Sequence, residues 1–371
     1  MNEFLREIYS QPKALRDTWN HIQEQYKEKF TELRTVLEEK NISRIIFTGM
    51  GSSYFSSYPS YYYLIKKGIS AEIREAGEFL FYGIPEKDKH SLERSVIVLI
   101  SQSGESGEIV RLLNKLKSLA PAPLIIGISN DSSSTLNRKS DYAFIIKAGT
   151  ETSVTSKSYT STLLFLFVFT TILSGQNFSS LNTSDIDDLI LEIDKFLENM
   201  KTFDNLYDRL LSFFGVNFDF LEILGRGPSL ATVYQGALNF KEIAKTYSEG
   251  NPCSTFNHGS IECLKKNTHI IILSSDKTNY KLNLNLIEKI VFKWKCGKIL
   301  HVANQDYQPN FSSHHIHDNP KIYLFQHRIK NPYLSPIMEI IVLQLLFFKI
   351  AEENNINPGE FYFTKKITKE I

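Results

Sequence analysis

Cysteine is scarce in this sequence. Only three of the 371 residues are cysteines, and no two of them form a C-x-x-C pair: Cys253, Cys263 and Cys296. An odd, sparse set without metal-binding spacing argues against a disulfide framework and against a structural zinc site. The cysteine content therefore indicates a reducing compartment.

An excess of charge of one sign is also missing. Lys and Arg total 42 and Asp and Glu total 41, which leaves a formal net charge of +1. A nucleic-acid binder, or a protein that binds anionic membranes, needs a basic excess somewhere along its chain. No nucleic-acid partner is therefore expected. The 18 Tyr and 26 Phe residues are interpreted as core and dimer packing, because no basic stripe accompanies them.

Apolar runs long enough to cross a membrane are absent as well. The two most apolar runs are Leu163–Leu173 and Ile337–Ile350, and the second is interrupted by Glu339, Gln344 and Lys349. Both fall short of the ~20 apolar residues that a spanning helix needs, so buried helices are predicted there. The charged N-terminus has no apolar signal-peptide core. We expect a cytoplasmic protein that makes no membrane contact.

Short strand-like runs alternate with segments of helical spacing along the whole chain. The predicted strands are Ser43–Thr48, Ser95–Ile100, Pro123–Ile128, Tyr142–Ile146, Leu221–Leu224, Thr268–Leu273 and Gly297–Val302. The clearest predicted helices are Glu108–Leu119, Leu230–Tyr247 and Leu282–Trp294. Strands that are apolar throughout and separated by helices indicate parallel sheets that are covered on both faces.

The second half of the chain repeats the motifs of the first. IIFTGMGSS matches LEILGRGPS and VIVLISQSGES matches HIIILSSDKTN, with nearly the same separation in both cases. The predicted fold is α/β: two tandem domains of one fold, each a mostly parallel sheet flanked by helices in three α/β/α layers, with a C-terminal tail. The predicted boundaries are an N-terminal helical segment 1–30, a first domain 31–175, a connector 176–205, a second domain 206–350 and a lid or tail 351–371.

Hydroxyl-rich turns follow three predicted strands of the first domain, at Thr48–Ser53, Ser101–Ser106 and Gly149–Ser158. Each turn alone is typical of an ordinary helix cap. All three, however, stand at the carboxyl edge of one predicted sheet, where open α/β sheets bind ligands. Backbone N–H groups at helix starts together with serine hydroxyls suit a phosphate. No Walker sequence and no full GxGxxG is present, so a nucleoside triphosphate is not expected.

These motifs resemble the sugar isomerase (SIS) domain family. The matching segments, in the family's order, are GMGSS, SQSGES, AGTETSVTSKSYTSTL, GRGPS, ALNFKEIAKTYSE and NHGS. Within the family they resemble the isomerase half of glucosamine-6-phosphate synthase, and the related glucosamine-6-phosphate deaminases and fructosamine-6-phosphate deglycases. The resemblance covers nearly the whole chain. It implies two SIS-type domains and a sugar 6-phosphate substrate.

The resemblance also implies roles for particular residues. The phosphate is expected to be held by Ser101, Gln102, Ser103 and Ser106, with Ser53 nearby. Val154 and Ser156 are expected to face the sugar. The expected catalytic residues are Glu242 for proton transfer, His258 for ring opening and Lys365 as the lid lysine that forms an imine. In relatives the histidine often comes from the neighbouring subunit, so a homodimer with shared active sites is expected.

Two departures from the synthase concern the amination step. The synthase has a lysine three residues before the glutamate, and this chain has Asn239 there. The tail reads GEFYFTKKITKE, so either Lys365 or Lys366 can be the counterpart of the lid lysine.

Each proposed residue also has an ordinary interpretation. From the residues alone, Glu242 is a solvated helix glutamate and His258 a loop histidine, and only the family spacing between them favours catalysis. The cluster His314, His315 and His317 lacks a tetrahedral ligand spacing and is interpreted as a loop. No metal and no cofactor are predicted.

The expected function is that of a phosphosugar isomerase/deaminase, which converts an amino sugar 6-phosphate such as glucosamine 6-phosphate to a ketose 6-phosphate and ammonia. The first cysteine is Cys253, so the sequence offers no N-terminal cysteine nucleophile to hydrolyse glutamine. The alternatives are a fructosamine-6-phosphate deglycase, a sugar-phosphate sensor without turnover, and a synthase subunit that takes ammonia from a separate glutaminase chain.

Overall fold

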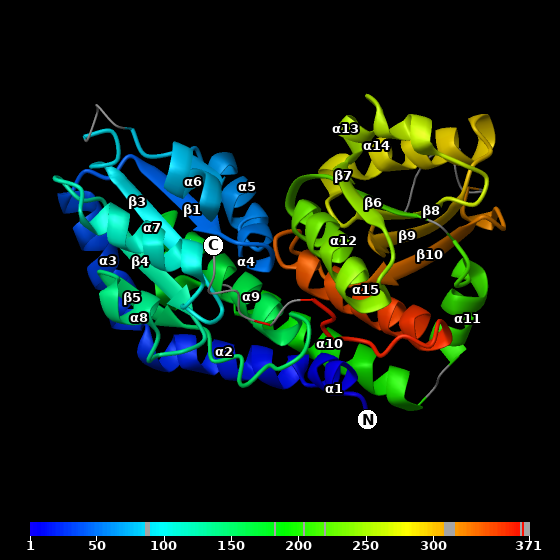
Figure 1. The fold of residues 1–371 in the computed structure, drawn as a ribbon, viewed down its shortest axis with the longest axis horizontal. Helices are drawn as coiled ribbons and strands as arrows, with labels where there is room; N and C mark the ends of the chain where they lie inside the picture. The colour runs from blue at the N-terminus through cyan, green and yellow to red at the C-terminus, as the bar shows by residue number, and fades with distance from the viewer. Residues whose placement is uncertain are drawn as a thin grey trace. The chain divides into compact units, whose positions relative to one another are not determined.

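The computed structural model describes residues 1–85, 90–181, 183–202, 205–218, 220–307, 316–363 and 366 (Figure 1). The chain divides into two compact units, each built around its own sheet. The first-sheet unit comprises Lys13–Asn182 and Phe361–Ile371, and the second-sheet unit comprises Met1–Pro12 and Thr183–Glu360.

The first-sheet unit contains a five-stranded parallel sheet with the order β2-β1-β3-β4-β5. The strands are β1 (Arg44–Gly49), β2 (Ala71–Glu75), β3 (Ser95–Ile100), β4 (Leu124–Ser129) and β5 (Tyr142–Ile145). Every residue of β3 and β4 is buried. These central strands are therefore covered on both faces, as their continuous apolar sequence predicts.

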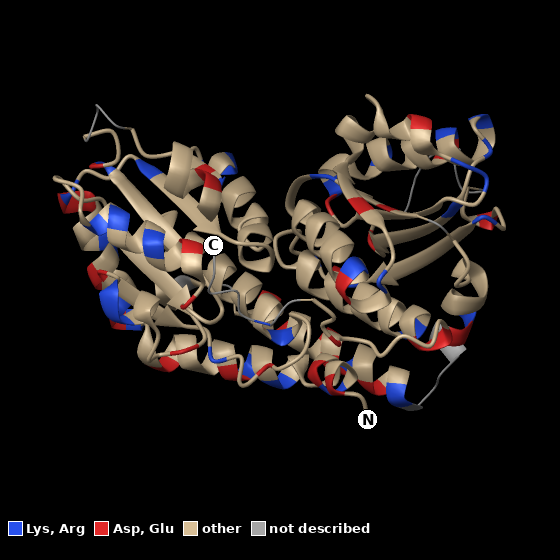
Figure 2. Cartoon of the chain, viewed as in Figure 1, with Lys and Arg blue, Asp and Glu red and all other residues tan. Residues whose placement is uncertain are grey.

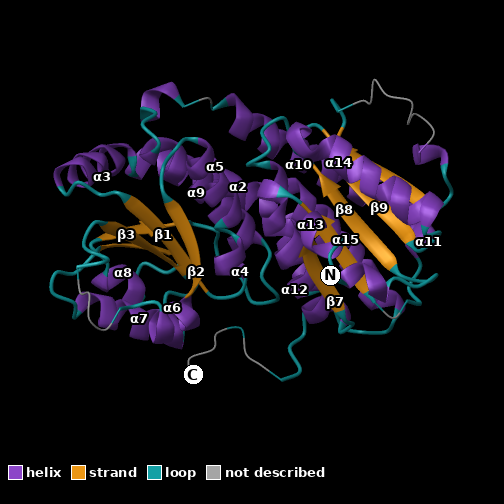
Figure 3. Cartoon of the chain, turned by 90° about the horizontal axis from the view of Figure 1, so that it is seen from above, coloured by secondary structure: helices purple, strands orange, loops and turns teal. Residues whose placement is uncertain are grey.

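Helices cover both faces of this sheet. They are α2 (Gln11–Gln25), α3 (Lys27–Glu39), α4 (Ser52–Phe55), α5 (Tyr58–Lys66), α6 (Ala76–Tyr82), α7 (Gly107–Lys117), α8 (Thr135–Lys139) and α9 (Lys157–Leu173). Figure 3 shows α3, α5 and α9 on one side of the sheet and α6, α7 and α8 on the other. The α9 side chains from Ser158 to Ile172 are all buried, which confirms the prediction of a buried helix.

The second-sheet unit repeats this topology. Its strands are β6 (Leu221–Gly225), β7 (Ser248–Pro252), β8 (His269–Ser274), β9 (Lys298–Asn304) and β10 (Ile322–His327), all parallel, in the order β10-β9-β8-β6-β7. In both sheets the first strand in sequence lies between the second and the third, and the fourth and fifth follow on the far side. The identical order supports the duplication predicted from the repeated motifs.

The helices of the second-sheet unit include one from the N-terminal segment. They are α1 (Glu3–Tyr9), α10 (Ser184–Thr202), α11 (Asn205–Phe214), α12 (Leu230–Ala244), α13 (Cys253–Phe256), α14 (Lys277–Glu288) and α15 (Ser335–Glu353), and a π-helical turn Lys289–Lys293 extends α14. In Figure 1, α13 and α14 lie on one side of the sheet and α12 and α15 on the other. Gln11 donates to Gln344 of α15 over 2.9 Å in a buried contact, which ties the chain's start to this unit.

Charged residues of both signs are scattered over the helices, and the strands carry few of them (Figure 2). No single-sign stripe runs over the described elements in this view, in keeping with the balanced composition. Among the described residues, no helix combines the length and the apolar character needed to span a bilayer.

Candidate active site

The Ser101–Ser106 loop follows β3 and leads into α7. Ser101 and Ser103 are buried, and Gln102 and Ser106 are half-buried. The Ser101 and Ser106 hydroxyl oxygens lie 3.4 Å apart, and Ser106 is the N-cap residue of α7 without a side-chain capping bond. The first turn of α7 therefore has N–H groups that its own cap does not satisfy, which is the arrangement that binds anions at helix starts.

The sharp bend of this loop depends on Gly104. Its φ of +65° lies in the left-handed region, and a Cβ placed there would stand 2.2 Å from the Ser134 hydroxyl oxygen. The Leu136 amide donates to the Gly104 carbonyl over 3.1 Å, and the Thr135 amide donates to the Glu105 carboxylate over 2.5 Å. The loop is thus fixed against the start of α8.

The turn that carries Ser53 starts from the strand next to β3. Strands β1 and β3 pair in register, with Thr48 opposite Leu99. Gly51 has a φ of +48°, which turns the chain sharply into α4, and Ser53 is half-buried at the start of that helix. The two predicted phosphate-binding turns therefore leave neighbouring strands at the same edge of the sheet.

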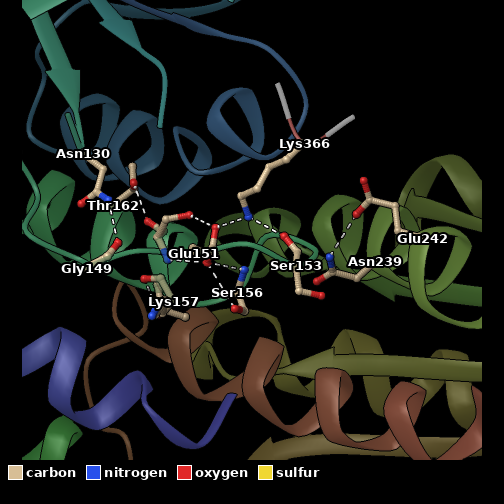
Figure 4. A network of polar contacts seen from close by, with 12 residues as sticks. Asn130, Gly149, Glu151, Ser153, Ser156, Lys157, Thr162, Asn239, Glu242 and Lys366 are labelled. Carbon is tan, nitrogen blue, oxygen red and sulfur yellow. Dashed lines mark hydrogen bonds and ion pairs between the residues drawn. The ribbon is translucent and has the colours of Figure 1, made fainter. Parts of the chain in front are cut away.

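The third hydroxyl-rich turn is organised around Glu151, which the sequence prediction did not single out. Glu151 is buried, and its Oε1 accepts hydrogen bonds from the Ser156 amide at 2.9 Å and the Ser158 amide at 3.0 Å. Its Oε2 accepts from the Ser158 hydroxyl at 2.6 Å and from Lys366 Nζ at 2.9 Å (Figure 4). Burial by itself raises the pKa of Glu151, but the Lys366 ammonium and the Ser158 hydrogen bonds outweigh it, so the pKa is lowered.

The predicted sugar-facing residues lie in this turn. Val154 and Ser156 are both fully buried here, and the Ser156 hydroxyl donates to Glu151 over 3.2 Å. Their contact with a sugar stays a prediction.

Asn130, just beyond the end of β4, connects the third turn with the Ser101–Ser106 loop. Its amide N–H donates to the Gln102 carbonyl over 2.9 Å, and its side chain donates to the Gly149 carbonyl over 2.8 Å. Its side-chain oxygen accepts from the Ala148 amide over 2.8 Å. The sequence prediction missed Asn130, although its place at the carboxyl edge of the sheet is a recognisable signal.

Glu242 lies near the end of α12 in the second-sheet unit and is half-buried. The Asn239 side chain, buried one turn earlier, donates to Glu242 Oε2 over 3.5 Å (Figure 4). Lys245, which ends the helix in a left-handed conformation, donates to the Glu242 carbonyl over 2.7 Å. The residue that replaces the synthase's lysine therefore contacts the proposed proton-transfer carboxylate directly.

His258 lies on the short connection between α13 and the 3-10 turn Ser260–Cys263 of the same unit, and its side chain is exposed. Its amide donates to the Thr255 carbonyl over 2.9 Å. Lys365 falls outside the described residues, as do His314 and His315. His317 contacts the buried His301 over 2.9 Å.

Glu222 is a buried carboxyl group that the sequence prediction also missed. Glu222 lies within β6 and accepts a hydrogen bond from the Asn251 side chain over 3.0 Å. The Asn251 side-chain nitrogen also lies 3.4 Å from the Ser260 hydroxyl oxygen, two residues along the chain from His258. The pKa of Glu222 is raised to about 8, mainly because the carboxyl group is buried. The hydrogen bond from Asn251 lowers this pKa and the nearby Glu249 raises it, and both effects are smaller than that of burial. The group is therefore protonated in neutral solution.

This raised pKa predicts a pH-dependent stability. Between the ordinary value of 4.5 and about 8, the folded state holds a proton that the unfolded state releases. The stabilisation is fully present below pH 4.5 and is lost as the pH rises through about 8, with a slope of up to about 1.4 kcal/mol per pH unit. Glu222→Gln, which keeps the shape without the titration, is expected to flatten this dependence. Urea unfolding from pH 5 to pH 9 measures it, and equal slopes in both proteins would refute the assignment.

The comparisons with known proteins agree with these features. Residues 38–173 match the SIS domain family. The curated relatives include a probable glutamine–fructose-6-phosphate aminotransferase [isomerizing] from Acanthamoeba polyphaga mimivirus, 27% identical over 362 residues. That match covers 95% of this chain and 55% of the relative, so the chain spans about half the length of such relatives.

Two solved structures show the same fold over nearly the whole chain. The C-terminal domain of glucosamine-fructose-6-phosphate aminotransferase from Francisella tularensis superposes with a TM-score of 0.79 at 23% identity, covering 97% of this chain and 98% of that one. Glucosamine-6-phosphate deaminase from Thermotoga maritima gives a TM-score of 0.68 at 19% identity, with 99% of both chains covered. The resemblance to the SIS family and to the isomerase half of the synthase is confirmed.

Proposed function

We propose that this protein is a phosphosugar isomerase/deaminase that converts an amino sugar 6-phosphate to a ketose 6-phosphate and ammonia. The observation that carries the proposal is the carboxyl edge of the first sheet, where the Ser101–Ser106 loop stands beside the Ser53 turn and Asn130 joins it to the Gly149–Ser158 turn. Serine hydroxyls and helix-start amides on adjacent strands suit the phosphate of such a substrate.

The proposed chemistry is proton transfer between C1 and C2 of the open-chain sugar. Glu242 removes the proton from one carbon and returns it to the other through an enediol or enolamine. From an amino sugar this leaves an imine at C2, and water then adds to C2 so that the C–N bond breaks and the ketose and ammonia are released. His258 opens the sugar ring by transferring a proton to and from the ring oxygen. The phosphate, held away from the reacting carbons, supplies binding energy that positions them. The scheme requires neither a metal nor a cofactor.

We further propose that the active form is a homodimer in which His258 serves the partner's site. If so, Glu242→Gln and His258→Ala chains are each inactive alone but recover activity when refolded together. From an equal mixture about half of all dimers pair the two variants, and each of these has one intact site of two, so about a quarter of the wild-type activity returns. Activity that stays at the level of the single variants would refute the sharing.

A substrate screen tests the function itself. The purified protein is incubated with 6-phosphorylated amino sugars and with fructosamine 6-phosphates, and ammonia, free amino acid and ketose phosphate are measured. Ammonia and ketose phosphate in equal amounts from the amino sugar support the proposal. Amino acid release from the fructosamine identifies a deglycase instead. Glucosamine 6-phosphate made from fructose 6-phosphate and ammonia identifies a synthase subunit, and binding without any product identifies a sensor.

A further inference from the structure

Lys366, in the C-terminal tail, inserts its side chain into the turn that Glu151 organises. Its Nζ donates to Glu151 Oε2 over 2.9 Å and also to the Ser153 carbonyl oxygen. The Lys366 side chain is only 18% exposed and the Glu151 side chain is fully buried, so the pair is shielded from solvent. Figure 4 shows Lys366 reaching down onto Glu151 and Ser153.

The surroundings of Glu151 make this contact more than a surface ion pair. The other four contacts of its carboxylate come from the amides and hydroxyls of Ser156 and Ser158, at 2.6 to 3.2 Å. None of these four donors carries a charge. Among the described residues, Lys366 is the one charged group that bonds to this carboxylate. A fully buried carboxylate that loses such a partner keeps the cost of desolvation without the compensating attraction, and breaking a buried pair in this way is strongly destabilising. The turn therefore favours the bound tail.

The turn that holds Lys366 is also linked to the Ser101–Ser106 loop, which is proposed to bind the phosphate. Asn130 bonds to the Gly149 carbonyl over 2.8 Å and to the Gln102 carbonyl over 2.9 Å. Gly149 begins the turn that Glu151 organises, and Gln102 belongs to the Ser101–Ser106 loop. The Lys366 contact and the Ser101–Ser106 loop are therefore connected within one unit, through the backbone from Glu151 to Gly149 and then through the hydrogen bonds of Asn130.

We propose that Glu151 and Lys366 are positioning residues that fasten the C-terminal tail to the Gly149–Ser158 turn, beside the site for the sugar phosphate. The effect of this contact on catalysis rests on the proposed function, but the attachment of the tail to the turn does not. A lysine ammonium that donates to a buried carboxylate has no lone pair for attack on a carbonyl. The geometry thus gives Lys366 the anchoring role. Lys365 then remains the candidate for the lysine that forms an imine with the sugar carbonyl.

Hydrogen–deuterium exchange of the tail amides tests the fastening without any sugar present. Lys366→Met and Glu151→Gln are each expected to speed the amide exchange of Lys366 and of residues 361–363 by at least about tenfold, with thermal unfolding recorded to show that the variants are folded. The double variant is expected to exchange no faster than the faster single one, because both changes break the same contact. Lys366→Arg keeps a charged donor and is expected to preserve slow exchange.

Lys349→Met is the matched control, because Lys349 makes an exposed pair with Glu352 and lies outside the tail. Tail exchange that is unchanged in both single variants would overturn the proposal, as would additive effects in the double variant.

Steady-state kinetics then distinguish an anchoring role of Lys366 from a role as the reactive amine. Lys366→Met is expected to raise KM about tenfold with a smaller change in kcat, and Lys366→Arg to restore KM. A wild-type protein that turns over no phosphosugar would defeat the proposed function and leave the exchange result standing. A kcat loss in Lys366→Met at unchanged KM and unchanged tail exchange would instead make Lys366 the reactive amine and contradict the anchoring role.

Discussion

Replacing Glu242 by glutamine is expected to lower kcat by about 10²- to 10⁴-fold, the usual contribution of a positioned general acid–base group. The amide keeps the size and the contact with Asn239 but cannot take a proton from the sugar carbon. KM is expected to change little, because the residues proposed to hold the phosphate belong to the other unit. Initial rates of ketose phosphate and ammonia formation measure both constants.

The control for this variant is Glu353→Gln, since Glu353 is an exposed glutamate near the end of α15 in the same unit. It is expected to retain wild-type kinetics. A Glu242→Gln protein that keeps more than a tenth of the wild-type kcat would remove Glu242 from the mechanism.

Replacing Gly104 by alanine is expected to raise KM for the phosphosugar about ten- to hundredfold. The added Cβ meets Ser134 Oγ at 2.2 Å and Ser134 Cβ at 2.5 Å, and the residue has a φ of +65°, so the loop has to shift. Each hydrogen bond to a charged group contributes about 1.5–3 kcal/mol, and the loss of one such bond to the phosphate corresponds to that range of affinity. Isothermal titration with a non-reacting phosphosugar measures the binding directly.

Gly68→Ala is the control that distinguishes the steric clash with Ser134 from the backbone strain of alanine at a positive φ. Gly68 has a similar φ of +76° but nothing within 4 Å of the added Cβ. Both variants are expected to lose about 1 kcal/mol or more of stability, because alanine is disfavoured in the left-handed region. Only Gly104→Ala is expected to lose phosphosugar affinity, and equal affinities in the two variants would contradict the role of this loop in phosphate binding.

The central strands could be predicted from the sequence because they are buried on both faces. All seven predicted strands are present, with ends that differ by at most a few residues, for example Pro123–Ile128 predicted and Leu124–Ser129 found. A strand that is apolar at every position is a distinctive pattern, because in a parallel sheet both of its faces are covered.

The three strands that the sequence prediction omitted, β2, β7 and β10, all lie at sheet edges. The β2 sequence, AEIRE, is mostly charged, and the β7 sequence, SEGNP, contains residues that are unfavourable within strands. Proline is tolerated there because an edge strand does not need every N–H. Gly250 is required by packing, since a Cβ on it would lie 2.6 Å from the Val233 carbonyl of α12.

For the candidate site, the turns could be predicted but not the residues that organise them. Serine-rich sequences after strands identify the Ser101–Ser106 loop, because strand ends and helix starts leave local patterns. The Glu151–Lys366 contact joins residues 215 positions apart, and no local pattern encodes such a pairing. Glu222 looks like an ordinary strand residue until its neighbours are known, because its pKa depends on burial beside Asn251 and Glu249.

Proton exchange at the sugar carbons is the most direct test of the account. Fructose 6-phosphate, with and without added ammonia, is incubated with the protein in D₂O, and proton NMR follows the C1 protons and the appearance of an aldose phosphate. Enzyme-dependent loss of one C1 proton signal, or aldose formation, that is abolished in Glu242→Gln is the predicted result. A wild-type protein that binds the sugar phosphate yet leaves the C1 protons and the ketose unchanged would contradict the proposed chemistry.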